Sequence, residues 1–236
     1  MFKLILTLAG ICAFLPSFAQ FAKVVDKDGY ANVREQANGQ SKIIGKVNSN
    51  EIVYVFDPFD LASGWINIDY VENEKIRFSG HMHTSRLKLI ADFEEIPLAI
   101  AEEHDATFIL RDIAVSIQSA PFDYELNKKL FSSTNYGDYT IEDKYKGKQV
   151  WGTDGTIPQT QYTSILITKG NSKIEIPRGE FENLFNVNND FANCYYDKDS
   201  DRIYITSVNS DGAGGYAVLF IIENGKYSKK IVLMPF

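Results

Sequence analysis

The chain contains Gly29-Tyr30-Ala31-Asn32-Val33-Arg34, and three further glycine-bearing pieces follow: Ile43-Ile44-Gly45-Lys46-Val47, Gly64-Trp65-Ile66-Asn67-Ile68 and Gly80-His81-Met82-His83-Thr84-Ser85-Arg86-Leu87. Each piece is a short apolar run bounded by a turn signal, which is typical of strands in a small all-β unit. Glycines at such positions allow sharp bends and close backbone approach, which a small barrel needs at its corners. This stretch therefore predicts one small β-barrel.

Side-chain alternation predicts the two faces of this barrel. Successive strand residues point to opposite sides, so Ile66 and Ile68 share one face, which we expect to be the core. Trp65 and Asn67 then lie on the other face. Further apolar runs at 24–25, 52–56 and 76–82 extend the unit, and we place its limits at residues 22 and 90.

In the order and spacing of these pieces, residues 22–90 resemble the bacterial SH3-like (SH3b) domain family. Two features depart from the family pattern: the long connection Asp57–Ser63, and the hairpin Tyr70–Arg77, which replaces the usual tight turn. The resemblance implies an SH3-like small barrel. It also implies binding of cell-wall peptide or glycan, because many family members are targeting modules attached to wall enzymes.

The same resemblance implies a groove with aromatic walls. Tyr30, Trp65 and His83 are its candidate residues, and Asn67 is added because it shares a face with Trp65. Aromatic rings suit this role because they offer a large contact area with little conformational entropy to lose. The alternative is that Tyr30 and Trp65 seal the barrel edge and contact no ligand.

The first residues predict export. Lys3 is followed by the apolar run Leu4–Leu15 and by Ser17-Phe18-Ala19, which has small residues where a signal peptidase cuts. We assign residues 1–19 to a signal peptide, so the protein is expected to be periplasmic or secreted. The apolar run is shorter than the ~20 residues that span a bilayer. A lipid anchor on Cys12 is the alternative, but Ile11 is bulky where a lipobox has a small residue.

The negative net charge of the chain excludes some classes of partner. The chain has a formal net charge of −7, and an acidic protein is repelled by phosphate backbones and anionic lipids. We therefore expect no nucleic acid partner and no membrane insertion once the signal is removed. The expected partners are peptidoglycan peptide or an extracytoplasmic protein.

Residues 91–236 predict a β-rich α+β domain. Residues 91–104 are expected to be a helical or extended linker, or in part a strand, because Ile96, Leu98 and Ile100 alternate. Residues 107–117 are expected to be one strand with a bulge near Arg111-Asp112. Lys169-Gly170-Asn171-Ser172 predicts a hairpin turn, and Pro177 the start of a short helix at 180–184. The last part predicts an antiparallel meander over 191–196, 202–208, 216–222 and 227–233.

Two glycine-rich loops lie in this domain, at 151–158 and 210–216. Neither has the pattern that cradles phosphate before a helix. One interpretation makes them a ligand-binding rim, with Trp151 and Tyr216 as anchors and Asp154 and Asp211 as polar contacts. The other is a pair of tight turns.

No pattern predicts a metal, a cofactor or a catalytic residue. His81 and His83 have a zinc-compatible spacing but lack a third ligand. Asp197-x-Asp199-x-Asp201 resembles the start of a calcium loop, but position twelve is Val208, so we expect a solvated hairpin turn. Cys194 has no histidine after it, and we expect it to be a buried apolar residue. No Gly-x-Ser-x-Gly elbow is present.

The sequence thus predicts a mainly β, exported, non-enzymatic binding protein, with an SH3b-like barrel at 22–90 and a β-rich domain at 91–236. Two other functions remain open at this point. One is an inhibitor or immunity protein that binds a toxin or a wall hydrolase, since negative charge favours a basic partner. The other is a wall-active hydrolase with carboxylates in the C-terminal domain.

Overall fold

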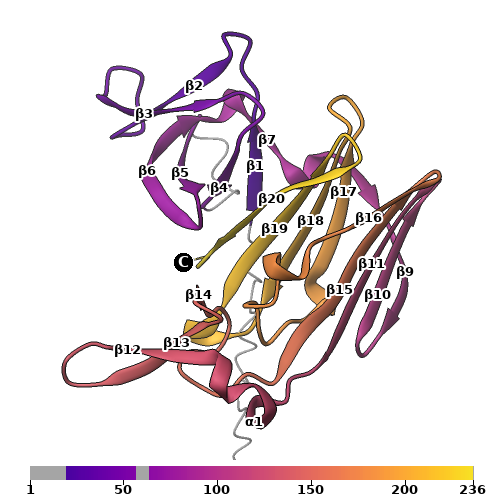
Figure 1. Cartoon of the computed structure of the whole chain (residues 1–236). Coiled ribbons are helices and arrows are strands. Elements are labelled where there is room, and N and C mark those ends of the chain that lie inside the picture. Colours follow the sequence, from indigo (N-terminus) through magenta and orange to yellow (C-terminus); the bar gives the residue numbers. More distant parts are fainter. Residues whose placement is uncertain (1–19, 57–63, 236) are drawn as a thin grey trace, which may run out of the picture.

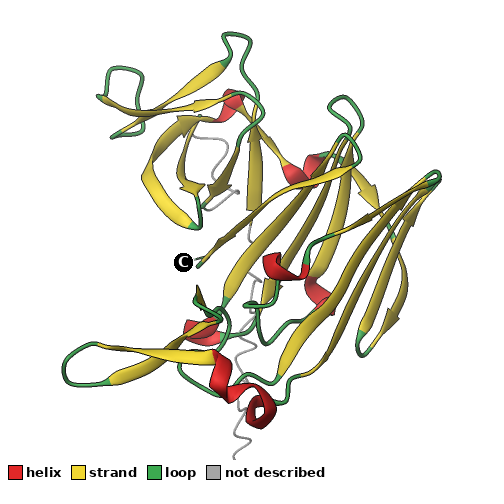
Figure 2. Cartoon of the chain, in the orientation of Figure 1, coloured by secondary structure: helices red, strands yellow, loops and turns green. Residues whose placement is uncertain are grey.

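The protein is mainly β, and a computed structural model describes residues 20–56 and 64–235. The expected signal peptide and the Asp57–Ser63 connection lie outside these residues. The described strands form four antiparallel sheets of seven, five, five and three strands (Figures 1 and 2).

Residues 20–56 and 64–89 form the seven-stranded N-terminal sheet, which curls into a half-barrel with strand order β3-β2-β6-β5-β4-β1-β7 (Figure 1). Alternate residues of these strands, among them Val33, Ile66, Ile68 and Met82, fill the concave side. This confirms that Ile66 and Ile68 face the core and that Trp65 and Asn67 do not. The strands are β1 (Gln20–Val24), β2 (Tyr30–Arg34), β3 (Ile43–Asn48), β4 (Ile52–Val55), β5 (Trp65–Glu72), β6 (Lys75–His83) and β7 (Leu87–Leu89).

Strands β5 and β6 form a long hairpin closed by a two-residue turn. Asn73 and Glu74 have φ values of 53° and 58°, as both central residues of a type I′ turn require. The expected enlargement at Tyr70–Arg77 is therefore an extension of the strands, and the turn itself is tight. The extended end of the hairpin reaches the C-terminal region.

The C-terminal region contains two five-stranded sheets that pack face to face. We call β20-β19-β18-β17-β8 the inner sheet and β16-β15-β11-β10-β9 the outer sheet. The inner strands are β8 (Glu94–Ile96), β17 (Ala192–Asp197), β18 (Arg202–Asn209), β19 (Tyr216–Glu223) and β20 (Lys226–Leu233). The outer strands are β9 (Leu98–Glu102), β10 (Asp105–Leu110), β11 (Ile113–Pro121), β15 (Thr160–Lys169) and β16 (Ser172–Glu175). The expected meander and the expected β15–β16 hairpin are confirmed.

The inner sheet is buried on both faces. In β19, Val218 and Phe220 belong to the core shared with the outer sheet, whereas Leu219 and Ile221 belong to a core shared with the N-terminal sheet. The seven residues from Tyr216 to Ile222 are consequently all buried. The protein thus has three layers, and the N-terminal sheet packs directly on the inner sheet.

A small three-stranded sheet lies at one end of the sandwich formed by the inner and outer sheets. The strands β12 (Phe131–Asn135), β13 (Thr140–Tyr145) and β14 (Lys148–Gln149) form a three-stranded sheet that projects outward (Figure 1). The short helix α1 (Tyr124–Asn127) precedes it, capped by the Asp123 side chain. Phe122, Phe131, Tyr145 and Phe185 hold this sheet to the sandwich through packed aromatic rings.

Two local predictions are corrected, and one open alternative is decided. Residues 107–117 are the two strands β10 and β11, because Arg111 adopts φ 53° and the chain turns there. The expected helix at 180–184 is a 3₁₀ turn at Arg178–Glu180, after which Leu184 bridges to Trp151. For residues 91–104, the strand alternative is confirmed: the segment contains β8 and β9, which pair with β17 and β10 in different sheets.

Candidate functional site

A groove of about 340 Å³ opens on the N-terminal sheet, and three of the predicted ligand-binding residues line it: Tyr30, Trp65 and His83. Tyr30 is the first residue of β2, Trp65 the first of β5 and His83 the last of β6. The β5–β6 register places Trp65 directly opposite His83. Strand geometry therefore brings these three side chains together.

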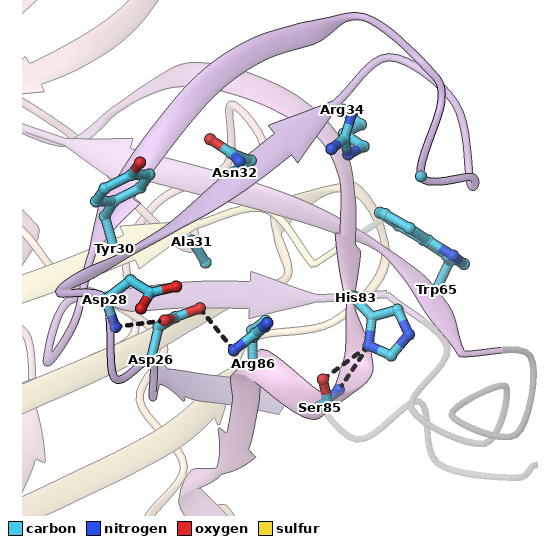
Figure 3. Close-up of a pocket in the computed structure, with 11 residues that line it drawn as sticks. Asp26, Asp28, Tyr30, Ala31, Asn32, Arg34, Trp65, His83, Ser85 and Arg86 are labelled. Carbon is cyan, nitrogen blue, oxygen red and sulfur yellow. Dashed lines mark hydrogen bonds and ion pairs between the residues drawn. The ribbon is translucent and has the colours of Figure 1, made fainter.

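The groove has an aromatic and basic end. The rings of Trp65 and His83 meet edge to face with centroids 5.3 Å apart, and the guanidinium carbon of Arg34 lies 6.0 Å from the Trp65 ring. Arg34 also donates to the backbone oxygen of Ser41, which fixes its direction. Figure 3 shows Arg34, Trp65 and His83 on one side of the groove.

The opposite end is acidic. Asp26 and Asp28 lie beside Tyr30 (Figure 3), in the turn between β1 and β2. The Asp28 backbone N–H donates to the Asp26 carboxylate at 2.8 Å, and Arg86 forms an ion pair with the same carboxylate at 3.0 Å. The Lys46 ammonium lies 4.0 Å from the centre of the Tyr30 ring. The groove therefore presents both signs of charge between two aromatic walls.

His83 is held by the turn that follows it. Its Nδ1 lies 2.8 Å from Ser85 Oγ and accepts the Ser85 backbone N–H at 3.2 Å. Because Nδ1 is an acceptor, a neutral His83 ring carries its proton on Nε2. The imidazole is thus a hydrogen-bond donor with a fixed orientation.

Several groove residues were missed by the sequence-based prediction, namely Asp26, Asp28, Asn32, Arg34, Ser85 and Arg86. The signal for two of them was present, because Ala31 and Val33 point into the core and Tyr30, Asn32 and Arg34 must then face outward. Asn67 shares the outward face but does not line the groove; it lies opposite His81.

The predicted rim of the C-terminal domain is partly wrong. Tyr216 is fully buried and donates to the backbone oxygen of Phe185, and Trp151 packs against it in the core. Neither ring lines the polar groove beside these loops, so neither anchors a ligand there, and Trp151 lines a different cleft. Burial also raises the pKa of the Tyr216 hydroxyl well above its ordinary value.

The two glycine-rich loops do meet. Ser210 donates to the backbone oxygen of Gly152, and Gly214 approaches Asp154 so closely that an added Cβ would lie 3.3 Å from its backbone nitrogen. Asp154 and Asp211 are both exposed. Asp211 lines a polar groove of about 450 Å³ with Asn186, Asn188 and Ser210.

The aspartates at 197, 199 and 201 do not form a solvated turn as a whole. Asp197 is buried and forms an ion pair with Lys23, and Asp201 forms one with Lys169. Among residues 20–56 and 64–235, no group of three or more histidine, cysteine, aspartate or glutamate side chains could hold a metal ion. Cys194 is buried, as expected, and burial raises the pKa of its thiol well above the usual range.

Comparisons with protein-family models, with curated proteins and with solved structures found no match to this chain. Within the described residues, no helix is long and apolar enough to cross a membrane.

Proposed function

We propose that this protein is an exported, non-enzymatic binding protein whose N-terminal sheet is an SH3b-like module. In this proposal the groove between Tyr30 and Trp65 binds a cell-wall peptide or a peptide segment of an extracytoplasmic protein. The observation that carries the proposal is the meeting of Tyr30, Trp65 and His83 in one groove with charges of both signs.

The distribution of charge supports a peptide ligand. Asp28 offers an acceptor for an ammonium group at one end, where the Asp26 carboxylate is already paired with Arg86, and Arg34 offers a donor for a carboxylate at the other. Free peptides carry both groups, and the aromatic walls can pack against the side chains between them. The placement in the wall compartment rests on the expected signal peptide at residues 1–19 and on the resemblance of residues 22–90 to wall-binding modules.

An inhibitor or immunity protein that binds a toxin or a wall hydrolase is the second candidate function, because the chain carries a formal net charge of −7. Negative charge steers a basic partner and speeds its association. An inhibitor or immunity protein would use its surface in this way.

The test is sedimentation of purified residues 20–236 with insoluble peptidoglycan, followed by calorimetric titration of soluble wall peptides. We expect the protein to sediment and Trp65→Ala to weaken peptide binding by about tenfold or more, which is about 1.4 kcal/mol. Asn67→Ala is the matched control, because Asn67 lies on the same strand outside the groove. Absence of sedimentation together with unchanged binding by Trp65→Ala would refute the wall-peptide proposal. A stoichiometric protein recovered from periplasmic extract would favour the second candidate.

A further inference from the structure

A second cleft, of about 440 Å³, lies at the other end of the β5–β6 hairpin from the aromatic groove. It is lined by this hairpin, by Trp151 next to β14 and by the end of β20. Figure 1 shows the end of the chain between the hairpin turn and β14. We call it the hairpin cleft. None of the residues of the aromatic groove lines it.

The walls of the hairpin cleft are apolar. Val71 and Leu233 are buried and belong to the core between the N-terminal and inner sheets. Ile76 and Met234 form the rim and are 54% and 51% exposed. Exposed apolar side chains beside a concave surface are typical of ligand sites, so this cleft can take apolar groups.

One buried carboxylate lines the hairpin cleft. Asp69 is 5% exposed, and Ser79 Oγ donates to its Oδ1. No other donor within the described residues reaches Asp69, so Oδ2 has no hydrogen-bond partner there. Burial, with the nearby Asp69 carboxylate, raises the pKa of Tyr54 to about 12. A carboxylate in an apolar site is stabilised by a cationic or hydrogen-bonding partner.

A buried donor lines the same cleft. Trp151 is 7% exposed, and its Nε1 is buried with no hydrogen-bond partner among the described residues. Buried polar atoms in native proteins are nearly always paired, and an unpaired one costs free energy. Two residues that line the cleft therefore carry unused hydrogen-bonding capacity: Trp151 has an unpaired donor, and Asp69 an acceptor with spare capacity.

The end of β20 adds backbone groups. This strand is the last of the inner sheet, and its far side pairs with no other strand of the described chain. Val232, Leu233 and Met234 of this edge line the cleft. Free edges are templates for an added strand, and added peptides bind through main-chain hydrogen bonds together with side-chain pockets.

We propose that the hairpin cleft binds an extended peptide segment of a partner protein that carries apolar side chains and one basic side chain. The segment lies along the free edge of β20 and places its apolar side chains against Val71 and Met234. One of its carbonyl oxygens accepts from Trp151 Nε1, and its basic group pairs with Asp69. Two other charged residues line the cleft. Glu74 is already paired with Lys230 at 2.8 Å. Lys75 is exposed, so water screens the repulsion between its ammonium and the basic group of the segment.

The experiment selects short random peptides, displayed on phage, against the full chain carrying Trp65→Ala, so that binding in the aromatic groove is weakened. The enriched peptide is synthesised and titrated by calorimetry into four proteins: wild type, Asp69→Asn, Ile76→Asp and Ile109→Asp. Ile76→Asp changes an exposed rim residue, so it tests the cleft even if Asp69→Asn folds poorly. Ile109→Asp is the matched control, because Ile109 is 46% exposed on β10 of the outer sheet.

We expect the enriched peptides to contain apolar residues and a lysine or arginine. Asp69→Asn should weaken binding by about 30-fold or more, as for a buried charge pair that loses one partner. Ile76→Asp should weaken it as well, and Ile109→Asp should not. Replacing the basic residue by norleucine should weaken binding to wild type but not to Asp69→Asn. Absence of enrichment, or equal binding to wild type, Asp69→Asn and Ile76→Asp, would overturn the proposal. Either result leaves peptidoglycan binding by the aromatic groove as a separate question.

Discussion

Lys23 and Asp197 form a buried ion pair between the N-terminal sheet and the inner sheet. The Lys23 ammonium nitrogen lies 2.7 Å from Asp197 Oδ2, and the two side chains are 8% and 2% exposed. Ser200 donates to the same carboxylate oxygen. The two residues are 174 positions apart, so the pair joins the two regions in addition to the apolar core between them.

Asp197→Ala should lower the free energy of unfolding by about 3–5 kcal/mol, because it leaves the buried Lys23 ammonium without its partner. Urea denaturation followed by tryptophan fluorescence measures this change. Asp199→Ala is the control in the same turn; Asp199 is exposed, and we expect a change within about 0.5 kcal/mol. If Asp197→Ala and Asp199→Ala lowered the free energy of unfolding equally, the Lys23–Asp197 ion pair would not stabilise the fold as stated.

The same pair predicts a dependence of stability on pH. Burial alone would raise the pKa of Asp197, but the ion pair with Lys23 and the hydrogen bonds from Ser200 outweigh it and lower the pKa below its usual value. The folded-state pKa then lies below the unfolded-state value of about 3.9. The contribution is therefore present above pH ~4 and is lost as the pH falls through the folded-state pKa.

This dependence is measured as the difference in unfolding free energy between wild type and Asp197→Asn across the acid range. The difference should be largest near neutral pH and should shrink as the pH falls below about 4. A difference that stays constant down to pH ~2 would contradict the lowered pKa.

Gly80→Ala should destabilise the N-terminal sheet. A Cβ at this position would lie 2.7 Å from the backbone oxygen of Arg34 and 2.9 Å from Val33 Cγ1, so the strands would have to separate. Overpacking of this kind costs about 1–3 kcal/mol. Thermal unfolding followed by circular dichroism measures the loss, with Gly39→Ala as control because no atom lies within 4 Å of its added Cβ. An unchanged transition for Gly80→Ala would show that the close approach is relieved easily.

Sequence patterns predicted much of the N-terminal sheet because alternation there is regular. The prediction of one strand failed at Arg111. A two-residue turn there shifts the alternation of apolar residues by one position between Leu110 and Ile113. A bulge produces the same shift in the sequence, so the pattern cannot separate the two. The turn became visible only through the pairing of Leu110 with Ile113.

The sequence contains a pattern that indicates the packing of the N-terminal sheet on the inner sheet, but the prediction did not use it. A continuous apolar run such as Tyr216–Ile222 indicates a strand buried on both faces, and the second face of β19 packs against the N-terminal sheet. In the aromatic groove, aromatic residues were predicted from the resemblance. Asp26 and Arg86 were missed because their pairing depends on how the β1–β2 turn lies against the turn after β6.

Cys194 should be inert in the folded protein. It is 1% exposed, and burial raises the pKa of its thiol, so little reactive thiolate is present. In purified residues 20–236, which lack Cys12, an aromatic disulfide reagent should react with Cys194 only after denaturant unfolds the chain. The reaction rate should follow the unfolding transition seen by fluorescence, and rapid labelling without denaturant would contradict the burial of Cys194.

Tyr30→Ala tests the acidic end of the aromatic groove independently of Trp65. The Tyr30 ring is 38% exposed and lies beside Asp26 and Asp28, so its removal takes one wall from the groove and leaves the core intact. We expect wall-peptide affinity to fall by about tenfold, or about 1.4 kcal/mol, with an unchanged thermal transition. Tyr139→Ala removes a more exposed ring, 58%, from the projecting three-stranded sheet and should leave affinity unchanged. If Tyr30→Ala and Tyr139→Ala bind the wall peptide with equal affinity, Tyr30 only seals the sheet edge, and the ligand binds elsewhere.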